Sequence, residues 1–396
     1  MSIKNDTKNY LRFNIITFLI LFFLSYSTVF VQKVNADFEN TLAQNVYNTA
    51  WNIINDKFYF KSNLNLSRWQ NKFKNKIDSL EESHKCINKL LQALDDPYTR
   101  FLSKEEFKDE QDIISSNFTG IGIKLSVQEP IILDVLEESP ASKEGIKLND
   151  YLLSVNNKST RNLKTDQIVN LLRGPKGTAL TINIKRGNKI ITKNLQREEL
   201  TFNAVSTKIL EDDIPVIKIS SFIPENTSKS FKDEILKLMS ANGLVVDLRN
   251  NSGGLMKNAI EIADMFLSEG RIVSTSNGLT KTNNFANSST IFDGAVVILV
   301  NENTASASEI FASALKENKR AILIGKKTFG KGLVQEIIQL PDESALHVTV
   351  AAYFTPSGKN INKVGIVPDE IIVNEEKQIE RAKEILLNAS SPVILL

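Results

Sequence analysis

The hexapeptide Thr304-Ala305-Ser306-Ala307-Ser308-Glu309 follows the apolar run Ala295–Val300 and indicates the fold of this chain. The run is typical of a buried strand, and the small polar residues after it are typical of a turn into a helix. A serine at such a junction presents its hydroxyl where the amides of a helix N-terminus converge. The stretch therefore predicts an α/β core with Ser306 at a strand end.

A second stretch, Phe329-Gly330-Lys331-Gly332-Leu333-Val334-Gln335, follows another apolar run, Ala321–Ile324. It supplies a glycine-flanked lysine 331 − 306 = 25 residues after the serine. A nucleophilic serine needs a base, and the chain has only 2 histidines, His84 and His347, neither in a motif that would make it one. The pattern favours a serine–lysine hydrolase.

Both residues have structural alternatives. Ser306-x-x-Glu309 is itself a capping box, so the serine could serve only the helix that follows. Lys331 could be a solvated lysine in a glycine turn. The segment from Gly325 to Lys331 also satisfies the phosphate-loop pattern G-x-x-x-x-G-K, but Gly332 stands where that loop needs a Ser or Thr for magnesium.

A glycine turn precedes both stretches in the chain. Leu244–Leu248 is predicted to be a strand and leads into Arg249-Asn250-Asn251-Ser252-Gly253-Gly254. Glycines bring bare backbone close to a substrate and leave amides for an oxyanion. The alternative is a helix N-terminus packed tightly on the sheet.

Alternating strands and helices after residue 200 predict the α/β core over 199–396. Apolar residues at helical spacing predict a helical region over 37–115, whose apolar faces are compatible with self-association. Its expected helices begin near Phe38, at Trp69 (to Leu80) and at His84 (to Leu94), and the following Asp95-Asp96 is expected to be a solvated helix end.

Residues 116–198 are expected to form a separate β-rich domain. The order of its strands and helices resembles a bacterial PDZ domain, and Gly120-Ile121-Gly122-Ile123 matches the carboxylate-binding loop of that family. Such a loop binds a free peptide C-terminus through backbone amides, and the peptide adds to a strand edge. The alternative for these glycines is an ordinary hairpin turn.

The composition indicates the general class of the protein and excludes some partners. With 396 residues, 42% of them hydrophobic and 24% charged, it is expected to be globular. The net charge of +2 argues against a nucleic-acid partner, and we expect neither a metal nor a cofactor. The single cysteine, Cys86, excludes an intramolecular disulfide and is expected to be a buried small hydrophobe.

Residues 1–36 are expected to direct export. Lys4, Lys8 and Arg12 precede the apolar stretch Ile15–Leu24, and Val34-Asn35-Ala36 offers a cleavage site. The alternative is an uncleaved membrane anchor, because looser apolar character extends over about the 20 residues that span a bilayer. Both predict a periplasmic or other extracytoplasmic protein.

Several motifs together resemble the C-terminal processing peptidases, also called tail-specific proteases. They cover essentially all of residues 40–370, in order: L-D-D-P-Y-T-R-F-L (94–102), I-S-S-F (219–222), D-L-R-N-N-S-G-G (247–254), A-D-M-F-L (263–267), T-A-S-A-S-E (304–309), T-F-G-K-G-L-V-Q (328–335), T-P-S-G-K-N-I (355–361) and G-I-V-P-D (365–369).

The resemblance implies a serine endopeptidase that recognises substrate C-termini through its PDZ domain. It implies Ser306 as nucleophile, Lys331 as base, Gln335 as the residue that orients the lysine, and amides of Ala307 and of Gly253 or Gly254 as the oxyanion hole. The lysine must be neutral, and the apolar neighbours Phe329, Leu333 and Val334 suit that purpose. The alternative function is an inactive PDZ-bearing scaffold.

The PDZ domain is also expected to gate the protease. Its insertion between the helical region and the core leaves two connections that can act as hinges. Arg173, which closes the last PDZ helix beside Gly174, is the candidate contact with the core. Its alternative role is a favourable charge at a helix C-terminus.

Overall fold

The computed structural model describes residues 39–390 except 61–64, 74–75, 116, 127–128, 137, 164, 202 and 289. The chain forms two compact units. The first comprises residues up to 107 together with 277–279 and 333–352, and the second comprises the rest. The expected signal peptide or anchor lies outside the described residues. Within the described ranges, no helix has the length and apolar character needed to cross a bilayer.

The first unit joins N-terminal helices to a hairpin from late in the chain. Residues 39–57 are helical, and α2 (Leu66–Lys72) and α3 (Leu80–Gln92) follow. Strand β1 (Arg100–Leu102) pairs antiparallel with β18 (Ala345–Phe354), which pairs with β17 (Leu333–Gln339). One cluster of buried side chains spans both parts and includes Val46, Ile54, Ile87, Leu346 and Val348.

Two expectations for this unit have clear outcomes. Cys86 is buried in the cluster, as predicted, with 8% of its surface exposed. The helix expected from Trp69 to Leu80 is wrong, because α2 ends at Lys72 and α3 begins at Leu80. The reason is a new N-cap: the Ser79 side chain accepts a hydrogen bond from the N–H of Glu82.

The second unit contains the PDZ domain and the α/β core. Helix α4 (Lys104–Ile114) leads into the PDZ domain. The PDZ strands pair as β2–β9, β3–β4 and β6–β5–β7–β8, and its core lies under α6. Its elements are β2 (Asn117–Gly120), β3 (Ile123–Leu125), β4 (Ile132–Val135), α5 (Pro140–Lys143), β5 (Tyr151–Val155), β6 (Lys158–Ser159), α6 (Thr165–Leu172), β7 (Ala179–Arg186), β8 (Lys189–Gln196) and β9 (Glu198–Thr201).

The core is a six-stranded sheet in the order β10–β11–β12–β15–β16–β19, parallel except for the edge strand β10. The antiparallel hairpin of β13 and β14 belongs to a different sheet. The elements are β10 (Val205–Ile209), β11 (Pro215–Ile219), α7 (Thr227–Ile235), β12 (Gly243–Asp247), α8 (Met256–Asp264), β13 (Arg271–Ser276), β14 (Lys281–Phe285), β15 (Ala295–Val300), α9 (Ala307–Glu317), β16 (Ile322–Gly325), β19 (Glu370–Ile371) and α10 (Glu375–Ser390).

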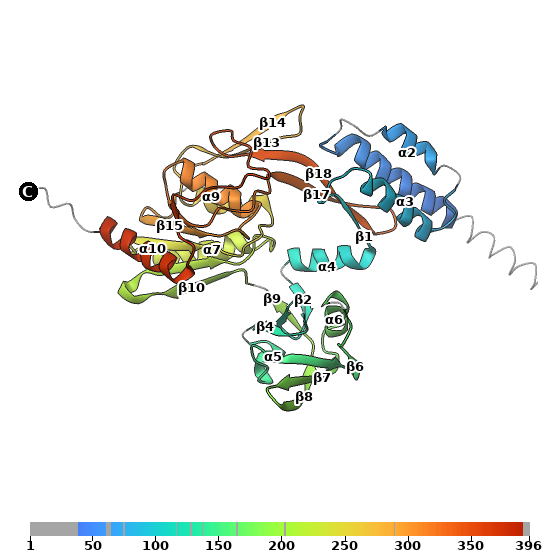
Figure 1. Cartoon of the computed structure of the whole chain (residues 1–396), viewed down its shortest axis with the longest axis horizontal. Helices are drawn as coiled ribbons and strands as arrows, with labels where there is room; N and C mark the ends of the chain where they lie inside the picture. Colours follow the sequence, from blue (N-terminus) through green and yellow to red (C-terminus); the bar gives the residue numbers. More distant parts are fainter. Residues whose placement is uncertain are drawn as a thin grey trace, which may run out of the picture. The chain divides into compact units, whose positions relative to one another are not determined.

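Helices cover both faces of this sheet (Figure 1). On one face, Ala382 and Leu386 of α10 pack against Val245 and Val297. On the other, phenylalanine rings link α7 to α9. Burial on both faces explains why the central strands are continuous apolar runs. The elements and sheets together confirm the expected mixed α/β architecture, with an inserted PDZ domain and an N-terminal helical region.

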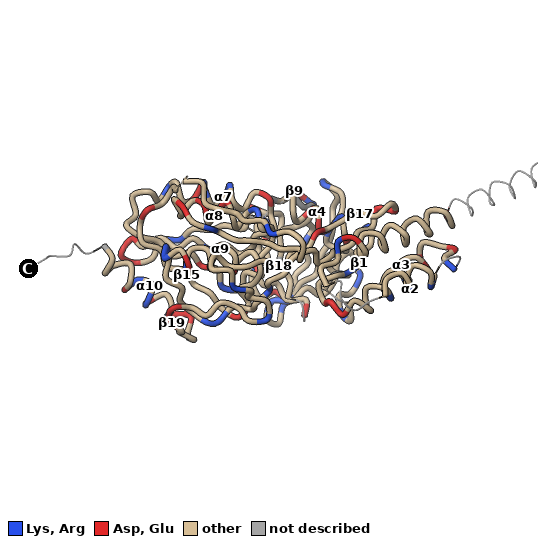
Figure 2. Tube along the Cα trace, turned by 90° about the horizontal axis from the view of Figure 1, so that it is seen from above, with Lys and Arg blue, Asp and Glu red and all other residues tan. Residues whose placement is uncertain are grey.

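Charges of both signs are interspersed along the described chain (Figure 2). Several form exposed pairs one helical turn apart, such as Lys85 with Glu81 and Lys229 with Asp233. Such pairs contribute little to stability because both partners remain solvated.

Candidate active site

Three loops leave the carboxyl ends of three neighbouring parallel strands. They follow β12, β15 and β16 and comprise residues 248–255, 301–306 and 326–332. In open parallel sheets this edge is where ligands bind. The topology therefore brings the glycine turn, the Ser306 turn and the Lys331 loop to one edge of the sheet, as the sequence predicts.

Ser306 lies in an unusual backbone conformation directly before α9. Its φ of 57° and ψ of −119° belong to a region that non-glycine residues rarely adopt. Such strain persists only where surrounding contacts impose it, and it is common at functional sites. Ser306 is half-buried, whereas its neighbours Ala305 and Ala307 are buried. The half-buried serine thus lies on a tight turn between β15 and α9.

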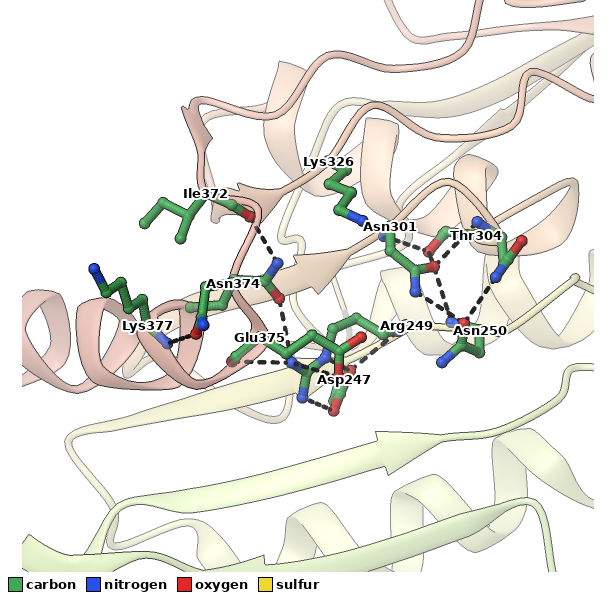
Figure 3. Close-up of polar contacts among 12 residues, drawn as sticks. Asp247, Arg249, Asn250, Asn301, Thr304, Lys326, Ile372, Asn374, Glu375 and Lys377 are labelled. Atoms are coloured by element: carbon green, nitrogen blue, oxygen red, sulfur yellow. Dashed lines mark hydrogen bonds and ion pairs between the residues drawn. The ribbon is translucent and has the colours of Figure 1, made fainter. Parts of the chain in front are cut away.

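The turn is held by an interlocked set of polar side chains (Figure 3). The Asn250 backbone N–H donates to Asn301 Oδ1 at 3.0 Å, and Asn301 Nδ2 donates to Asn250 Oδ1 at 2.9 Å. The buried Thr304 hydroxyl donates to the Leu248 carbonyl at 2.9 Å and accepts from the Asn301 N–H at 3.0 Å. These bonds fix the loop after β12 against the loop that carries Ser306.

Arg249 connects the same loop to α10 (Figure 3). Its guanidinium donates to both carboxylate oxygens of Asp247, at 2.9 and 2.7 Å, and to Gln378 Oε1 at 3.2 Å. Asp247 and Arg249 have side-chain exposures of 8% and 12%, so the pair is largely removed from water. Asp247 and Arg249 therefore serve the architecture of the loop.

The glycine turn lies against the start of α9. Phe222 N–H donates to the Gly253 carbonyl, and Leu255 N–H donates to the Phe222 carbonyl. The Gly253 N–H itself donates to Asn251 Oδ1 at 2.9 Å, so it is already engaged. Among the described residues no hydrogen-bond acceptor is found for the N–H of Gly254 or of Ala307. These two amides are the better candidates for an oxyanion hole.

Glu309 connects the serine turn to the lysine loop. Its Oε2 accepts the backbone N–H of Ser306 and the backbone N–H of Lys331, each at 2.9 Å. Its Oε1 accepts the Thr328 hydroxyl at 2.5 Å and the Gly330 N–H at 2.8 Å. The carboxylate is fully buried. Burial raises the pKa of Glu309, and the four hydrogen bonds oppose that rise.

Tyr353 makes a second connection between the same two segments. Its hydroxyl donates to the carbonyls of Ser306, at 3.1 Å, and of Lys331, so that its single proton is shared between the two. The side chain is buried, with 1% exposed. No motif in the sequence marks Tyr353, because its role depends on β18 returning to the lysine loop. Glu309 is visible in the sequence only as a capping residue.

The lysine loop also rests on the segment 361–366. Lys363 N–H donates to the Gly330 carbonyl at 2.7 Å, and Thr328 N–H donates to the Ile366 carbonyl at 3.1 Å. A Cβ on Gly330, whose φ is +88°, would lie 2.6 Å from the Gly365 nitrogen. The segment 361–366, which includes Gly365, thus packs against the lysine loop and supports its backbone.

One expectation about the surroundings of Lys331 is wrong. Phe329 was expected to help exclude water from the Lys331 amine, but 56% of the Phe329 surface is itself exposed to water. Lys331 itself is half-buried. Leu333 is buried, with 5% exposed, in the first unit.

Gln335 lies on β17 within a polar network of the first unit. Its Nε2 donates to Thr349 Oγ1 at 3.4 Å, and that hydroxyl donates to Asp96 Oδ2 at 2.7 Å. The Thr99 hydroxyl donates to the same oxygen at 2.6 Å. Asp96 was expected to be solvated; that is wrong, because it is half-buried and accepts from two threonines.

The predicted carboxylate-binding loop of the PDZ domain lies between β2 and β3. Ile121 is buried and its carbonyl accepts the Ala141 N–H, while the Gly122 carbonyl accepts the Leu136 N–H. Ile123 begins β3, whose pairing partner among the described strands is β4. Among the described strands, none pairs with the other edge of β3.

Arg173 forms an ion pair with Asp109 of α4. The expected contact of Arg173 with the catalytic core is therefore replaced here by a contact with the helix that leads into the PDZ domain. A second arginine, Arg197, was not singled out in the sequence. It is buried and donates to the carbonyls of Leu171 and Leu172, so it satisfies the C-terminus of α6.

Comparison with known proteins agrees with this geometry. Residues 213–372 match the family described as Peptidase family S41, and residues 111–185 match the PDZ domain. The chain is 35% identical over 347 residues to a carboxyl-terminal-processing protease of Picosynechococcus, covering 82% of each protein. The chain belongs to the carboxyl-terminal-processing protease family. It is a serine-type peptidase with a PDZ domain.

Two further relatives support this assignment. This chain is 37% identical over 291 residues to the carboxy-terminal processing protease CtpA of Bacillus subtilis. The match covers 72% of this chain and 62% of that protein. The solved structure of the photosystem II D1 C-terminal processing protease matches with a TM-score of 0.60 and 27% identity. That match covers 87% of this chain and 97% of the other.

Proposed function

We propose that this processing protease is an exported endopeptidase that uses Ser306 as its nucleophile and Lys331 as its general base. One observation carries the proposal: the backbone N–H groups of both residues bond to the same oxygen of Glu309. These two bonds hold the two backbone segments next to each other, which a proton transfer between their side chains requires. The strained turn at Ser306 and the amides beside it support the same assignment.

The proposed reaction is acyl transfer in two stages. Ser306 Oγ attacks the scissile carbonyl while a neutral Lys331 amine takes its proton, and the N–H groups of Gly254 and Ala307 stabilise the oxyanion. The lysine then donates that proton to the leaving amine. Water hydrolyses the acyl-enzyme, with Lys331 again as base. Gln335 is proposed to orient the lysine amine; this role rests on the motif T-F-G-K-G-L-V-Q.

The base must lose its proton before it can act. At an ordinary lysine pKa of about 10.4, roughly one amine in 2,500 is neutral at pH 7. Removing water around the amine favours the neutral form. Because Phe329 is exposed in the described conformation, we propose that bound substrate supplies part of that exclusion.

The substrates we propose are protein tails with a free C-terminus, bound by the PDZ domain. The tail would lie along the open edge of β3, with its carboxylate at Gly120-Ile121-Gly122-Ile123. Thr165 of α6 donates to the Ser126 carbonyl at 3.2 Å. This contact places the start of α6 beside the end of β3, the arrangement that a peptide-binding groove between them requires.

A serine-directed fluorophosphonate probe tests the proposal against an inactive scaffold. We expect wild-type protein to be labelled at Ser306, with or without a C-terminal peptide as activator, and Ser306→Ala to lose the label. Ser308→Ala is the matched control, since the Ser308 hydroxyl donates to the Asn251 carbonyl inside the core. A wild-type protein that never takes the label would leave the scaffold as the function.

A further inference from the structure

We propose that Glu309 is a positioning residue for the Ser306–Lys331 pair, with Tyr353 as its counterpart on the carbonyl side. This inference rests on the proposed function of those two residues. It assigns the geometry between the nucleophile and the base to a buried carboxylate that does not touch the substrate. A cap of the helix alone would need only the bond to Ser306.

The four partners of Glu309 are all hydrogen donors. Three are backbone N–H groups, and the fourth is the Thr328 hydroxyl, which already accepts the Ile366 N–H at 2.7 Å and so turns its own proton toward Glu309. An ionised carboxylate can accept all four bonds. The site is therefore built for a negatively charged group with two oxygens.

The two oxygens have different partners. Oε1 holds Thr328 and Gly330, both in the lysine loop. Oε2 holds one N–H from each segment, Ser306 and Lys331. Because the single atom Oε2 accepts both N–H groups, neither the Ser306 turn nor the lysine loop can move away from the other without breaking one of these two bonds. Tyr353 repeats this arrangement with the two carbonyls.

Isosteric substitutions separate positioning from packing. In Glu309→Gln an amide nitrogen replaces one oxygen, so whichever way it faces at least one backbone N–H loses its acceptor. Tyr353→Phe removes only the hydroxyl. The matched controls are Asp264→Asn, at a carboxylate that accepts the Asn287 N–H at 2.7 Å, and Tyr47→Phe, at a buried tyrosine that donates to the Trp69 carbonyl at 2.9 Å.

The first measurement is amide hydrogen exchange of the full-length protein. In Glu309→Gln we expect faster exchange in two peptides together, one covering 301–309 and one covering 326–332, with the rest of the sheet unchanged. If only one segment exchanges faster, or neither does, Glu309 does not connect them and the inference is wrong. This readout does not depend on enzyme activity.

The second measurement is the rate of fluorophosphonate labelling and of cleavage. We expect Glu309→Gln to lower kcat by about 10- to 100-fold with little change in KM, and Tyr353→Phe to lower it less. The control variants should behave as wild type. Faster exchange in both peptides of Glu309→Gln with an unchanged kcat would make Glu309 purely structural and overturn the inference. An unreactive wild type overturns the proposed function instead, and joint loosening would then still support the connection.

Discussion

Gly253 packs so closely against Ser306 that an added Cβ would lie 2.8 Å from the Ser306 Cβ. The same atom would lie 2.7 Å from the Ala305 carbonyl and 2.9 Å from the Ala307 nitrogen. All three distances are too short for a carbon atom, so any side chain at position 253 must displace the serine turn.

Gly253→Ala is therefore expected to lower kcat by about 100-fold, because a displacement near 1 Å at the proposed nucleophile, Ser306, would have an effect of that size. The measurement is cleavage of a peptide reporter together with the melting temperature. Gly278→Ala is the control, since Gly278 has a similar φ of +89° but nothing within 4 Å of the added carbon. Equal losses in both variants would mean that backbone strain alone, and not the crowding of Ser306, is responsible.

Lys331→Arg tests the base. Arginine keeps the positive charge but does not deprotonate in proteins, so we expect cleavage to fall by about 100- to 10,000-fold. Lys326→Arg is the control, because Lys326 forms an exposed ion pair with Glu302 at 3.0 Å. Near-normal cleavage by Lys331→Arg would point to another base, with His347 as the next candidate to replace.

The ion pair of Arg173 with Asp109 makes the gating hypothesis testable. A free C-terminal peptide is expected to stimulate cleavage of a second reporter that lacks a recognisable tail, because binding stabilises the competent conformation. Arg173→Ala should abolish that stimulation without weakening peptide binding. Asp109→Asn should raise cleavage in the absence of peptide, because it releases Arg173. Lys176→Ala, at an exposed pair with Glu199, is the control. Equal rates with and without peptide would reduce the PDZ domain to a tether.

The ion pair of the buried Asp150 with the half-buried Arg186 predicts a pH dependence of stability. Burial alone would raise the pKa of Asp150, but hydrogen bonds from Arg186, at 2.7 Å to each oxygen, and from the Lys147 N–H hold that pKa below its usual range. A carboxyl with a lowered pKa stabilises the fold above its unfolded pKa of about 3.9, and this contribution is lost as the pH falls through the folded value.

Asp150→Asn should therefore cost about 1 kcal/mol in the free energy of unfolding near pH 7, because it weakens the hydrogen bonds to Arg186, whose charge remains partly solvated. Its difference from wild type should shrink below about pH 4. Denaturant unfolding at several pH values, followed by hydrogen exchange in β5 and β7, measures both. A difference that stays constant with pH would contradict an ionised Asp150.

Local sequence patterns predicted those strands and helices whose own residues form a continuous apolar run or a helix-start motif. Runs buried on both faces predicted β12, β15 and β16, and the helix predicted to follow the Ser306 turn is α9, which begins at Ala307. Strand β10 and helix α10 were not predicted. The apolar positions of α10 are spaced among many charges, and their function is clear only once Ala382 and Leu386 meet the sheet.

The site was predictable as far as its motifs extend. Ser306, Lys331 and the glycine turn come together as expected because parallel strands end at one edge. The supporting residues were missed, since Tyr353, Asp96 and Arg197 act through partners distant in the chain: Tyr353 bonds to Ser306, and Asp96 to Thr349. Spacing along a sequence contains no information on such pairs.

The composition of the first unit has a consequence for biosynthesis. Residues 39–107 complete their hydrophobic cluster with Leu340, Leu346 and Val348. As the chain emerges during synthesis, the N-terminal helices must keep apolar faces uncovered until more than two hundred later residues have appeared. Contacts of such long separation also form slowly. The PDZ strands, by contrast, all pair with one another within residues 117–201, so their partners emerge together.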